Sequence, residues 1–139
     1  LSAHTGINWQ YKAGQLSGFD RIYHAIIIPE YREPVHILKR TLNNLALQNF
    51  PRAWIIVVLA TEATDDSAEK VAGELKQTFQ DKFGHFLVTR HELKSGEITG
   101  KSSNMAHAAS ELIVYLKKYS IPADQVLVTS CDADALIHP

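Results

Sequence analysis

Short apolar runs alternate with amphipathic stretches along most of the chain. Runs rich in Val, Ile and Leu each predict a strand, at residues 24–28, 54–60, 86–89 and 125–130. Continuous apolar runs of this kind are typical of parallel strands covered on both faces. We therefore expect all of these strands, including the last, to be buried.

Amphipathic helices separate the strands. Pro34 can begin the first helix, because its missing N–H costs nothing at a first helical position, and Phe50-Pro51 ends it. Asp65, Asp66 or Ser67 can cap the second, and Ile121-Pro122 ends the third. Apolar side chains recur at helical spacing: Val35, Leu38, Leu42 and Leu45, then Val71, Leu75 and Phe79, then Met105, Ala109, Leu112, Leu116 and Tyr119.

Repetition of strand and helix predicts an α/β, Rossmann-like domain with a mainly parallel sheet and helices on both faces. Residues 1–21 are mixed and turn-like, so we expect an irregular lead-in followed by one domain at 22–139. Ligands of open parallel sheets bind outside the carboxyl ends of the strands. Residues 29–34, 60–66 and 131–139 are therefore where a site is expected.

Composition narrows the function classes. A formal net charge of −1 gives no reason to expect binding of nucleic acid or an anionic membrane. Cys131 is the single cysteine, which fits a reducing compartment, and an inert buried residue is favoured over a ligand or nucleophile. No apolar run approaches the ~20 residues that span a bilayer. The chain begins at Leu1, and we expect both ends to be cut from a longer protein, which can carry membrane segments.

Asp132-Ala133-Asp134 follows the last predicted strand directly. In extended chain, residues two apart face the same side, so both carboxylates can converge on one cation. Mg²⁺ and Mn²⁺ prefer oxygen ligands and often bridge carboxylates to substrate phosphates. An isolated Asp-x-Asp triplet is more often a turn or a helix cap, but its place at a strand end favours a metal diphosphate site. The seven histidines show no metal-ligand spacing.

Three segments, in this order, resemble family 2 glycosyltransferases, which include cellulose, chitin and hyaluronan synthases. Residues 29–34 are similar to the family's loop after the first strand, and residues 100–106 to its Gly-Lys helix start. Residues 126–139 look like its apolar strand, Asp-x-Asp motif and trailing proline. The resemblance covers about residues 22–139. It implies the nucleotide-binding half of a GT-A fold, truncated after the Asp-x-Asp motif.

The resemblance also implies a chemistry. The donor would be a nucleotide sugar, usually a UDP-sugar, bound with Mn²⁺ or Mg²⁺, and transfer would invert the anomeric carbon. The acceptor would be a carbohydrate or lipid-linked molecule bound by the full-length protein at the cytoplasmic face of a membrane. The catalytic base would lie beyond Pro139, so this chain alone would bind donor without transferring sugar.

Site residues carry over from the resemblance one by one. Asp134 would ligate the metal, and Asp132 would lie against the ribose, the diphosphate and the metal. Lys101 would sit near the base or the diphosphate, with a merely solvated residue as the alternative. The first loop would line the nucleoside pocket with Pro29, Glu30 and Tyr31, and with Glu33 nearby. The alternative for Tyr31 is an aromatic loop residue that simply packs on the edge of the sheet.

The chain departs from the family's pattern in three places. The family commonly has an acidic pair after the second strand, where Glu62 is the substitute candidate, although a turn or helix-cap role is favoured on its residues alone. Arg32 stands where Asn is usual, and His107 replaces another Asn. The chain's early end would also leave the fourth strand at or near a sheet edge through which copies can self-associate.

Two other function classes remain. A sugar nucleotidyltransferase has a related sheet, but it follows its first strand with a glycine-rich phosphate loop, and residues 29–34 contain no glycine. A non-catalytic regulatory module with a degenerate site is the other. Metal-dependent UDP binding would distinguish that module from a transferase.

Overall fold

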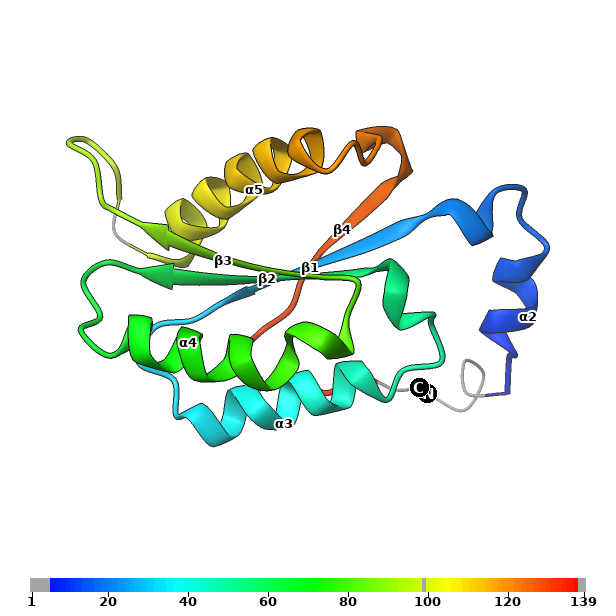
Figure 1. Cartoon of the computed structure of the whole chain (residues 1–139), viewed down its shortest axis with the longest axis horizontal. Coiled ribbons are helices and arrows are strands. Elements are labelled where there is room, and N and C mark those ends of the chain that lie inside the picture. The colour runs from blue at the N-terminus through cyan, green and yellow to red at the C-terminus, as the bar shows by residue number, and fades with distance from the viewer. Residues whose placement is uncertain (1–5, 99, 138–139) are drawn as a thin grey trace.

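One sheet of four parallel strands organises the computed structural model, which describes residues 6–98 and 100–137. The strands follow the order β3-β2-β1-β4 (Figure 1). Their bounds are β1, Tyr23–Pro29; β2, Ile55–Glu62; β3, His85–His91; and β4, Val126–Ser130. Every neighbouring pair is parallel. The predicted α/β class and parallel sheet are confirmed.

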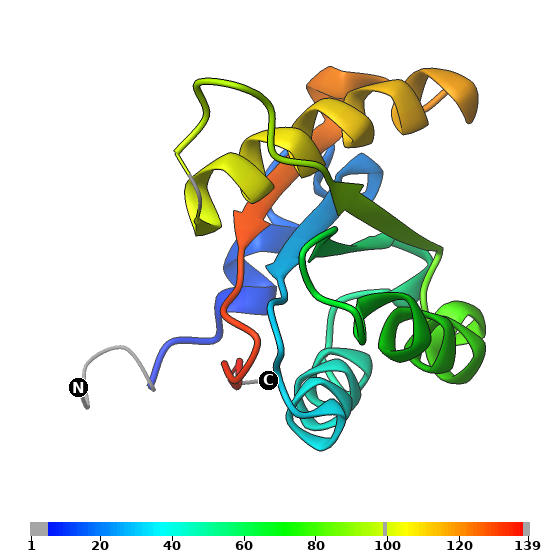
Figure 2. The ribbon, with the colours of Figure 1, turned by 90° about the vertical axis from the view of Figure 1, so that its left-hand side faces the viewer.

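Helices cover both faces of this sheet, as expected. Helices α3 (Val35–Ala46) and α4 (Ala68–Phe79) lie on one face, and α5 (Lys101–Lys118) lies on the other (Figures 1 and 2). The first of these ends at Ala46, earlier than the Phe50-Pro51 stop predicted from the sequence. The chain between it and β2 forms a short 3₁₀ turn at Arg52–Trp54 instead.

Successive side chains of the central strands feed a core on each face. Ile26 and Ile28 of β1 pack with Leu38 and Leu42 on the α3 side. Ala25 and Ile27 belong to the core beneath α5. This alternation is the geometry of an extended chain, in which neighbours point to opposite faces. Strand β2 is buried along its whole length because both neighbours and both helical layers enclose it.

Strand β4 is far more exposed than its apolar sequence predicts. Leu127 is 61% exposed and Val128 is 56% exposed. The strand pairs only with β1, so it forms one edge of the sheet, while α5 packs over β1, β2 and β3. The prediction of a buried fourth strand is therefore wrong, whereas its placement at a sheet edge is confirmed.

The lead-in is less irregular than expected. Helix α2 (Trp9–Gly14) lies within it, and the Asn8 side chain caps this helix by accepting a hydrogen bond from the Tyr11 N–H at 2.8 Å. A 3₁₀ turn at Phe19–Arg21 follows, and the Phe19 ring packs edge-on against Phe50 with centroids 6.1 Å apart. Residues 1–5 lie outside the described chain. Among the described helices, none combines the length and apolar character that a bilayer-spanning segment requires.

Candidate functional site

The carboxyl end of the sheet carries a cavity at the point where the strand order reverses. From β1 the sheet extends to β2 on one side and to β4 on the other, and such switch points are where open α/β sheets bind ligands. The cavity measures about 480 Å³. All the predicted site residues line it: Pro29, Glu30, Tyr31, Glu33, Glu62, Lys101, Asp132 and Asp134. Three strand ends and the start of α5 thus converge on one space.

Asp132 and Asp134 are both exposed, with buried Ala133 between them. The expectation that both acids face the same side agrees with this alternation, although the chain here forms a turn rather than extended strand. The Ala135 N–H closes that turn by donating to the Asp132 carbonyl at 3.0 Å. One residue earlier, the Cys131 N–H donates to the Ile27 carbonyl at 2.9 Å, which continues the pairing of β4 with β1. Pro139 lies outside the described residues.

Cys131 faces the core rather than the cavity. It is 5% exposed and packs among the apolar side chains on the α3 face. Burial raises the pKa of its thiol, and the neighbouring Asp132 carboxylate adds to that rise. A thiol that resists ionisation is a poor nucleophile and metal ligand. The inert reading of this cysteine is supported.

Lys101 begins α5 and points at the acidic turn. Its Nζ forms an ion pair with Asp132 Oδ1. The side chains are 49% and 65% exposed, and ion pairs in such surroundings contribute little to stability. The lysine therefore has a partner at the cavity mouth, so the alternative of a merely solvated residue does not describe it. Gly100 precedes it with φ 147°, a backbone conformation that favours glycine.

Two buried oxygens on the cavity wall lack a hydrogen-bond partner within the described chain: Glu30 Oε2 and Asn104 Oδ1. Glu30 Oε1 accepts from the Glu33 N–H at 3.2 Å, and Asn104 Nδ2 donates to the Ala60 carbonyl at 3.0 Å. Burial raises the pKa of the Glu30 carboxyl, and the Glu33 N–H only partly opposes this. An unpartnered buried polar group costs about 1–3 kcal/mol. Asn104 was not predicted as a site residue, because a polar residue on a helix gives no sequence signal of facing a cavity.

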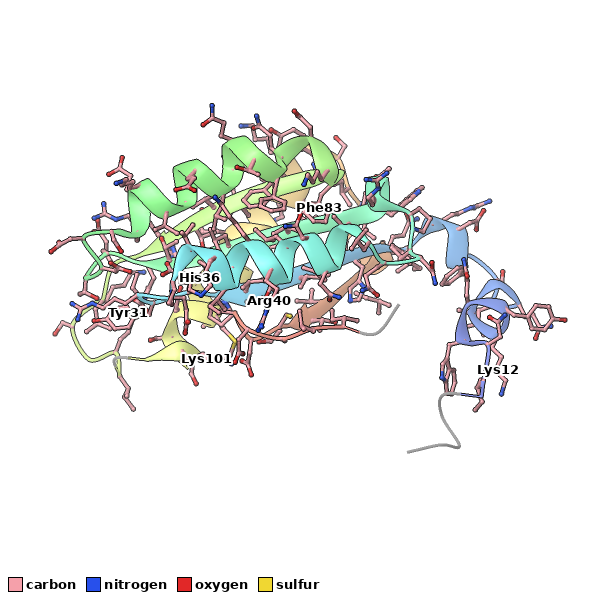
Figure 3. The ribbon with its side chains drawn as sticks, turned by 90° about the horizontal axis from the view of Figure 1, so that it is seen from below. Lys12, Tyr31, His36, Arg40, Phe83 and Lys101 are labelled. Carbon is pink, nitrogen blue, oxygen red and sulfur yellow. The ribbon has the colours of Figure 1, made fainter. Side chains whose placement is uncertain are left out.

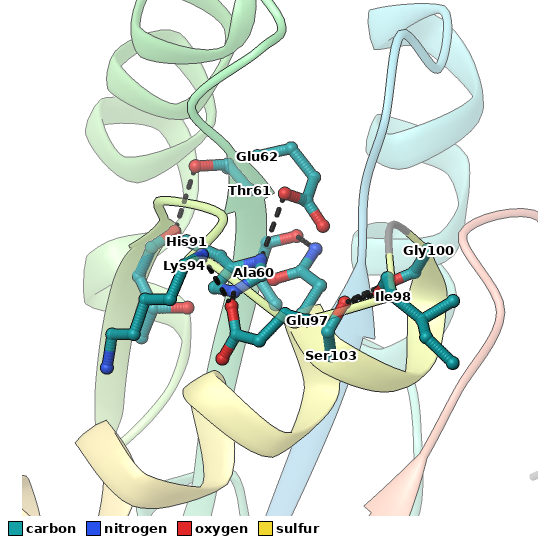
Figure 4. A network of polar contacts seen from close by, with 11 residues as sticks. Ala60, Thr61, Glu62, His91, Lys94, Glu97, Ile98, Gly100 and Ser103 are labelled. Carbon is teal, nitrogen blue, oxygen red and sulfur yellow. Dashed lines mark hydrogen bonds and ion pairs between the residues drawn. The ribbon is translucent and has the colours of Figure 1, made fainter.

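Glu62 belongs to a buried network that reaches the loop before α5 (Figure 4). Its Oε2 lies 3.1 Å from His91 Nδ1, and His91 Nε2 lies 3.1 Å from Glu97 Oε2. Glu97 Oε2 also accepts from the Lys94 N–H at 2.8 Å. His91 is 1% exposed, so its contact with Glu62 is shielded, whereas Glu97 at the other end of the network is exposed. Glu62 does begin a turn, because its carbonyl accepts from the Asp65 N–H at 3.1 Å, but it does not cap α4, and its side chain contacts His91 and lines the cavity.

Tyr31 is half exposed at the cavity rim, and the Arg32 guanidinium lies 5.1 Å from the centre of its ring. Arg32 has a φ of 57°, in the left-handed region that Asn tolerates better than most residues. The Arg32 N–H donates to Asp65 Oδ2 at 2.8 Å, which ties the loops after β1 and β2 together.

Asp65 holds the start of α4 without occupying the cap position. Ser67 occupies that position but makes no side-chain cap bond. Instead, Asp65 Oδ1 accepts from the Ser67 N–H at 2.8 Å and from its hydroxyl at 2.7 Å. Burial alone would raise the pKa of Asp65, but the hydrogen bonds from Ser67 and Arg32 outweigh it and hold the pKa below its ordinary value. This acid is committed to structure.

The donor set suits a cation that arrives with phosphate oxygens. Within residues 6–98 and 100–137, no three His, Cys, Asp or Glu side chains gather into a metal-binding group. Asp132 and Asp134 supply two carboxylates at the cavity mouth. Mg²⁺ commonly binds through one or two carboxylates together with substrate phosphates and water, rather than in an all-protein cage. The residues fit a metal held in that shared way.

Comparison with known proteins identifies the fold. No family model matches the chain, and no curated protein matches it significantly. Among solved structures, a mannosyltransferase from Pyrobaculum calidifontis in complex with GDP-Man and Mn²⁺ matches 84% of the chain at 21% identity, with a TM-score of 0.54. TarS from S. aureus in complex with UDP-GlcNAc matches 81% at 24% identity, with a TM-score of 0.49. The chain spans under a third of either protein, 28% and 27%. It shares the α/β fold of the mannosyltransferase.

Proposed function

We propose that this chain binds a nucleotide-sugar donor, with a UDP-sugar as the first choice, as the donor-binding part of an inverting, metal-dependent glycosyltransferase. The convergence of the eight cavity residues named above carries the proposal. They come from segments up to about a hundred residues apart in sequence, and the structure brings them to one cavity. The fold shared with a mannosyltransferase supports the same conclusion.

In the proposed complex, the first loop and Glu62 contact the nucleoside. Tyr31 offers a half-exposed ring on which a base can stack. The buried oxygens of Glu30 and Asn104 provide acceptors on the inner wall once the side chains adjust to a ligand. Lys101 exchanges its ion pair with Asp132 for the diphosphate. GDP-sugars are the alternative donors, because the chain lacks the acidic pair by which the resembled family contacts the base.

Asp132 and Asp134 would hold Mn²⁺ or Mg²⁺ against the diphosphate, and the metal would neutralise charge on the departing nucleoside diphosphate. Asp134 is the stronger candidate ligand, because the resemblance places Asp132 against the ribose and the diphosphate as well. The carboxylates of Asp132 and Asp134 orient the metal and the donor. Deprotonation of the acceptor hydroxyl needs a further base, and Asp65 is already occupied by Ser67 and Arg32.

Calorimetric titration of the chain with UDP and GDP, with and without Mn²⁺, tests the proposal. We expect metal to tighten nucleotide binding and Asp134→Ala to reduce that enhancement by roughly tenfold or more. Asp124→Ala is the matched control, because Asp124 is an exposed acid that lies just before β4, at the opposite end of the strand. Metal enhancement that survives Asp134→Ala would remove this residue from the site.

The two rival functions give different results in the same assays. A sugar nucleotidyltransferase would form a nucleotide sugar from a nucleoside triphosphate and a sugar phosphate, which a product assay detects. A degenerate regulatory module would bind nucleotide without metal dependence, or not at all. Neither result is expected.

The chain alone should bind donor without transferring sugar. General-base assistance is worth about 10²–10⁴-fold, and we expect the base and the acceptor site in later parts of the full-length protein. A carbohydrate or lipid-linked acceptor at the cytoplasmic face of a membrane is the setting we propose for it. Metal-dependent transfer by this chain to simple acceptors, abolished by Asp134→Ala, would show that the base lies within these 139 residues.

A further inference from the structure

Helix α3 presents a row of polar side chains to the segment that follows β4. Thr41 Oγ1 donates to the Ala133 carbonyl at 2.6 Å, and Arg40 Nη2 donates to the Asp134 carbonyl at 3.3 Å. Farther along, Asn44 Oδ1 accepts from the Ile137 N–H at 2.7 Å, and Gln48 Nε2 donates to the Ile137 carbonyl at 3.0 Å. Side chains of α3 and of the turn just after it therefore hold the backbone of the segment within its turn and beyond it. Figure 3 shows Arg40 pointing from α3 toward this segment.

The spacing of this row explains how a helix can do so. Positions 41 and 44 lie three residues apart, so they share one face of α3 beside the apolar stripe of Leu38, Leu42 and Leu45, and Gln48 follows in the turn just after the helix. The apolar stripe docks the helix on the sheet. The polar row then meets the segment 131–137, whose inward residues Cys131, Ala133, Ala135 and Ile137 pack on the same core.

Thr41 has the strongest contact of the row. Its side chain is 1% exposed, and its hydroxyl bonds the carbonyl of the residue that separates the two acids. A hydrogen bond is worth more in such a shielded place, because water cannot replace the lost donor. Anchoring the Ala133 carbonyl fixes the peptide plane between Ala133 and Asp134 and thereby restrains the turn that carries both carboxylates.

We propose that Thr41 is a positioning residue that sets the geometry of the Asp132 and Asp134 carboxylates through its hydrogen bond to the Ala133 carbonyl. This role rests on the proposed metal-dependent binding at the same site. Partners that orient metal ligands typically change metal affinity by about 10–100-fold when they are removed. Thr41 does not line the cavity, so its effect would act through the turn.

Thr41→Val keeps the side-chain shape and removes the donor. We expect it to weaken Mn²⁺ binding in the presence of UDP by roughly tenfold or more, while metal-free UDP binding stays unchanged. Thr41→Ser keeps the hydroxyl and should restore metal binding. Thr78→Val is the matched control, since Thr78 Oγ1 also donates to a backbone carbonyl, at 2.8 Å, but on α4. The Mn²⁺ electron paramagnetic resonance spectrum reports the change in coordination, which a general loss of stability would not mimic.

The outcomes separate this role from the function on which it rests. If the unmodified chain shows no metal-dependent nucleotide binding, the proposed function fails and this role fails with it. If the unmodified chain binds with metal and Thr41→Val binds equally well with the same spectrum, the positioning role alone is overturned. Should the valine variant not fold, Thr41→Ala, which cannot clash, takes its place. Hydrogen exchange at the Ala135 amide should accelerate in either variant, and unchanged protection would also overturn the role.

Discussion

Among residues 6–98 and 100–137, two non-glycine residues, Arg32 and Ser120, hold left-handed backbone conformations, and they do so in different settings. Arg32 has a φ of 57° in the loop beside the cavity, where its N–H is bonded by Asp65. Ser120 has a φ of 56° just after α5. Its N–H donates to the Lys117 carbonyl at 3.2 Å, and the Ile121 N–H donates to the Leu116 carbonyl at 2.9 Å. This is the hydrogen-bond pattern of a helix end that usually contains glycine.

Ser120→Gly should therefore stabilise the fold. Glycine adopts the left-handed conformation without the steric cost of a Cβ, so we expect the free energy of unfolding to rise by about 0.5–1 kcal/mol. Urea denaturation measures the change. Arg32→Gly is the comparison, and it should gain less because it also loses the contact with the Tyr31 ring. A loss of stability in the Ser120 variant would contradict this account of the helix end.

Glu30 should make stability depend on pH. Its folded pKa is raised, so above the ordinary range of glutamate the unfolded chain has released the proton while the folded chain still holds it. The contribution of this group to stability is therefore greatest in acid and falls as the pH rises through the raised pKa. Glu30→Gln keeps an acceptor for the Glu33 N–H and removes the charge. We expect the variant to be more stable than the parent at neutral pH and nearly equal below the ordinary pKa of glutamate.

Thermal unfolding across that pH range checks the expectation, with Glu92→Gln as an exposed control. If the stability difference between Glu30→Gln and the parent were the same in acid and at neutral pH, the buried Glu30 carboxyl would not be the cause of the pH dependence.

At the scale of the elements, periodicity predicts most of what the structure contains. The apolar runs locate all four strands to within a few residues, because a parallel strand needs both faces apolar. The predicted burial is wrong for β4, because burial depends on the elements that cover a strand and not only on the sequence of the strand. Helix α2 is missed because its cap, Asn8, stabilises a short helix with no buried side chain. The cavity residues could be predicted because the motifs that contain most of them follow strand ends. Thr41 could not be predicted, because its hydrogen-bond partner lies 92 residues away in sequence.

Asp65 joins two loops that strand pairing alone would leave independent. It accepts hydrogen bonds from the Arg32 N–H after β1 and from Ser67 at the start of α4. Hydrogen bonds to charged groups are worth about 1.5–3 kcal/mol each. Asp65→Ala should therefore lower the free energy of unfolding by roughly 2–3 kcal/mol. Chemical denaturation measures this, with exposed Asp66→Ala as the control, and equal effects of the two substitutions would argue against the tether.

At the scale of the whole molecule, β4 forms an edge of the sheet that carries exposed apolar side chains. Val128 of β4 is 56% exposed, and an unpaired apolar edge is a template for pairing with another strand. We expect weak, concentration-dependent self-association, which Val128→Lys should reduce because a charge on the edge disfavours pairing. Sedimentation equilibrium tests this. Val114→Lys changes an equally exposed valine on α5 and should have no effect, so a similar response in both variants would move the contact away from the edge.

The pairing of β4 with β1 has a consequence for how the molecule folds. His24 and Thr129 lie 105 positions apart in sequence, whereas β1, β2 and β3 pair with nearer neighbours in the chain. Closing a long loop must be completed before its contacts contribute, so distant pairings form slowly. Strand β4 and the turn with Asp132 and Asp134 that follows it should consequently be the last part to become ordered. A nascent chain would acquire a folded β1-β2-β3 unit first and gain its complete cavity only when the final strand arrives.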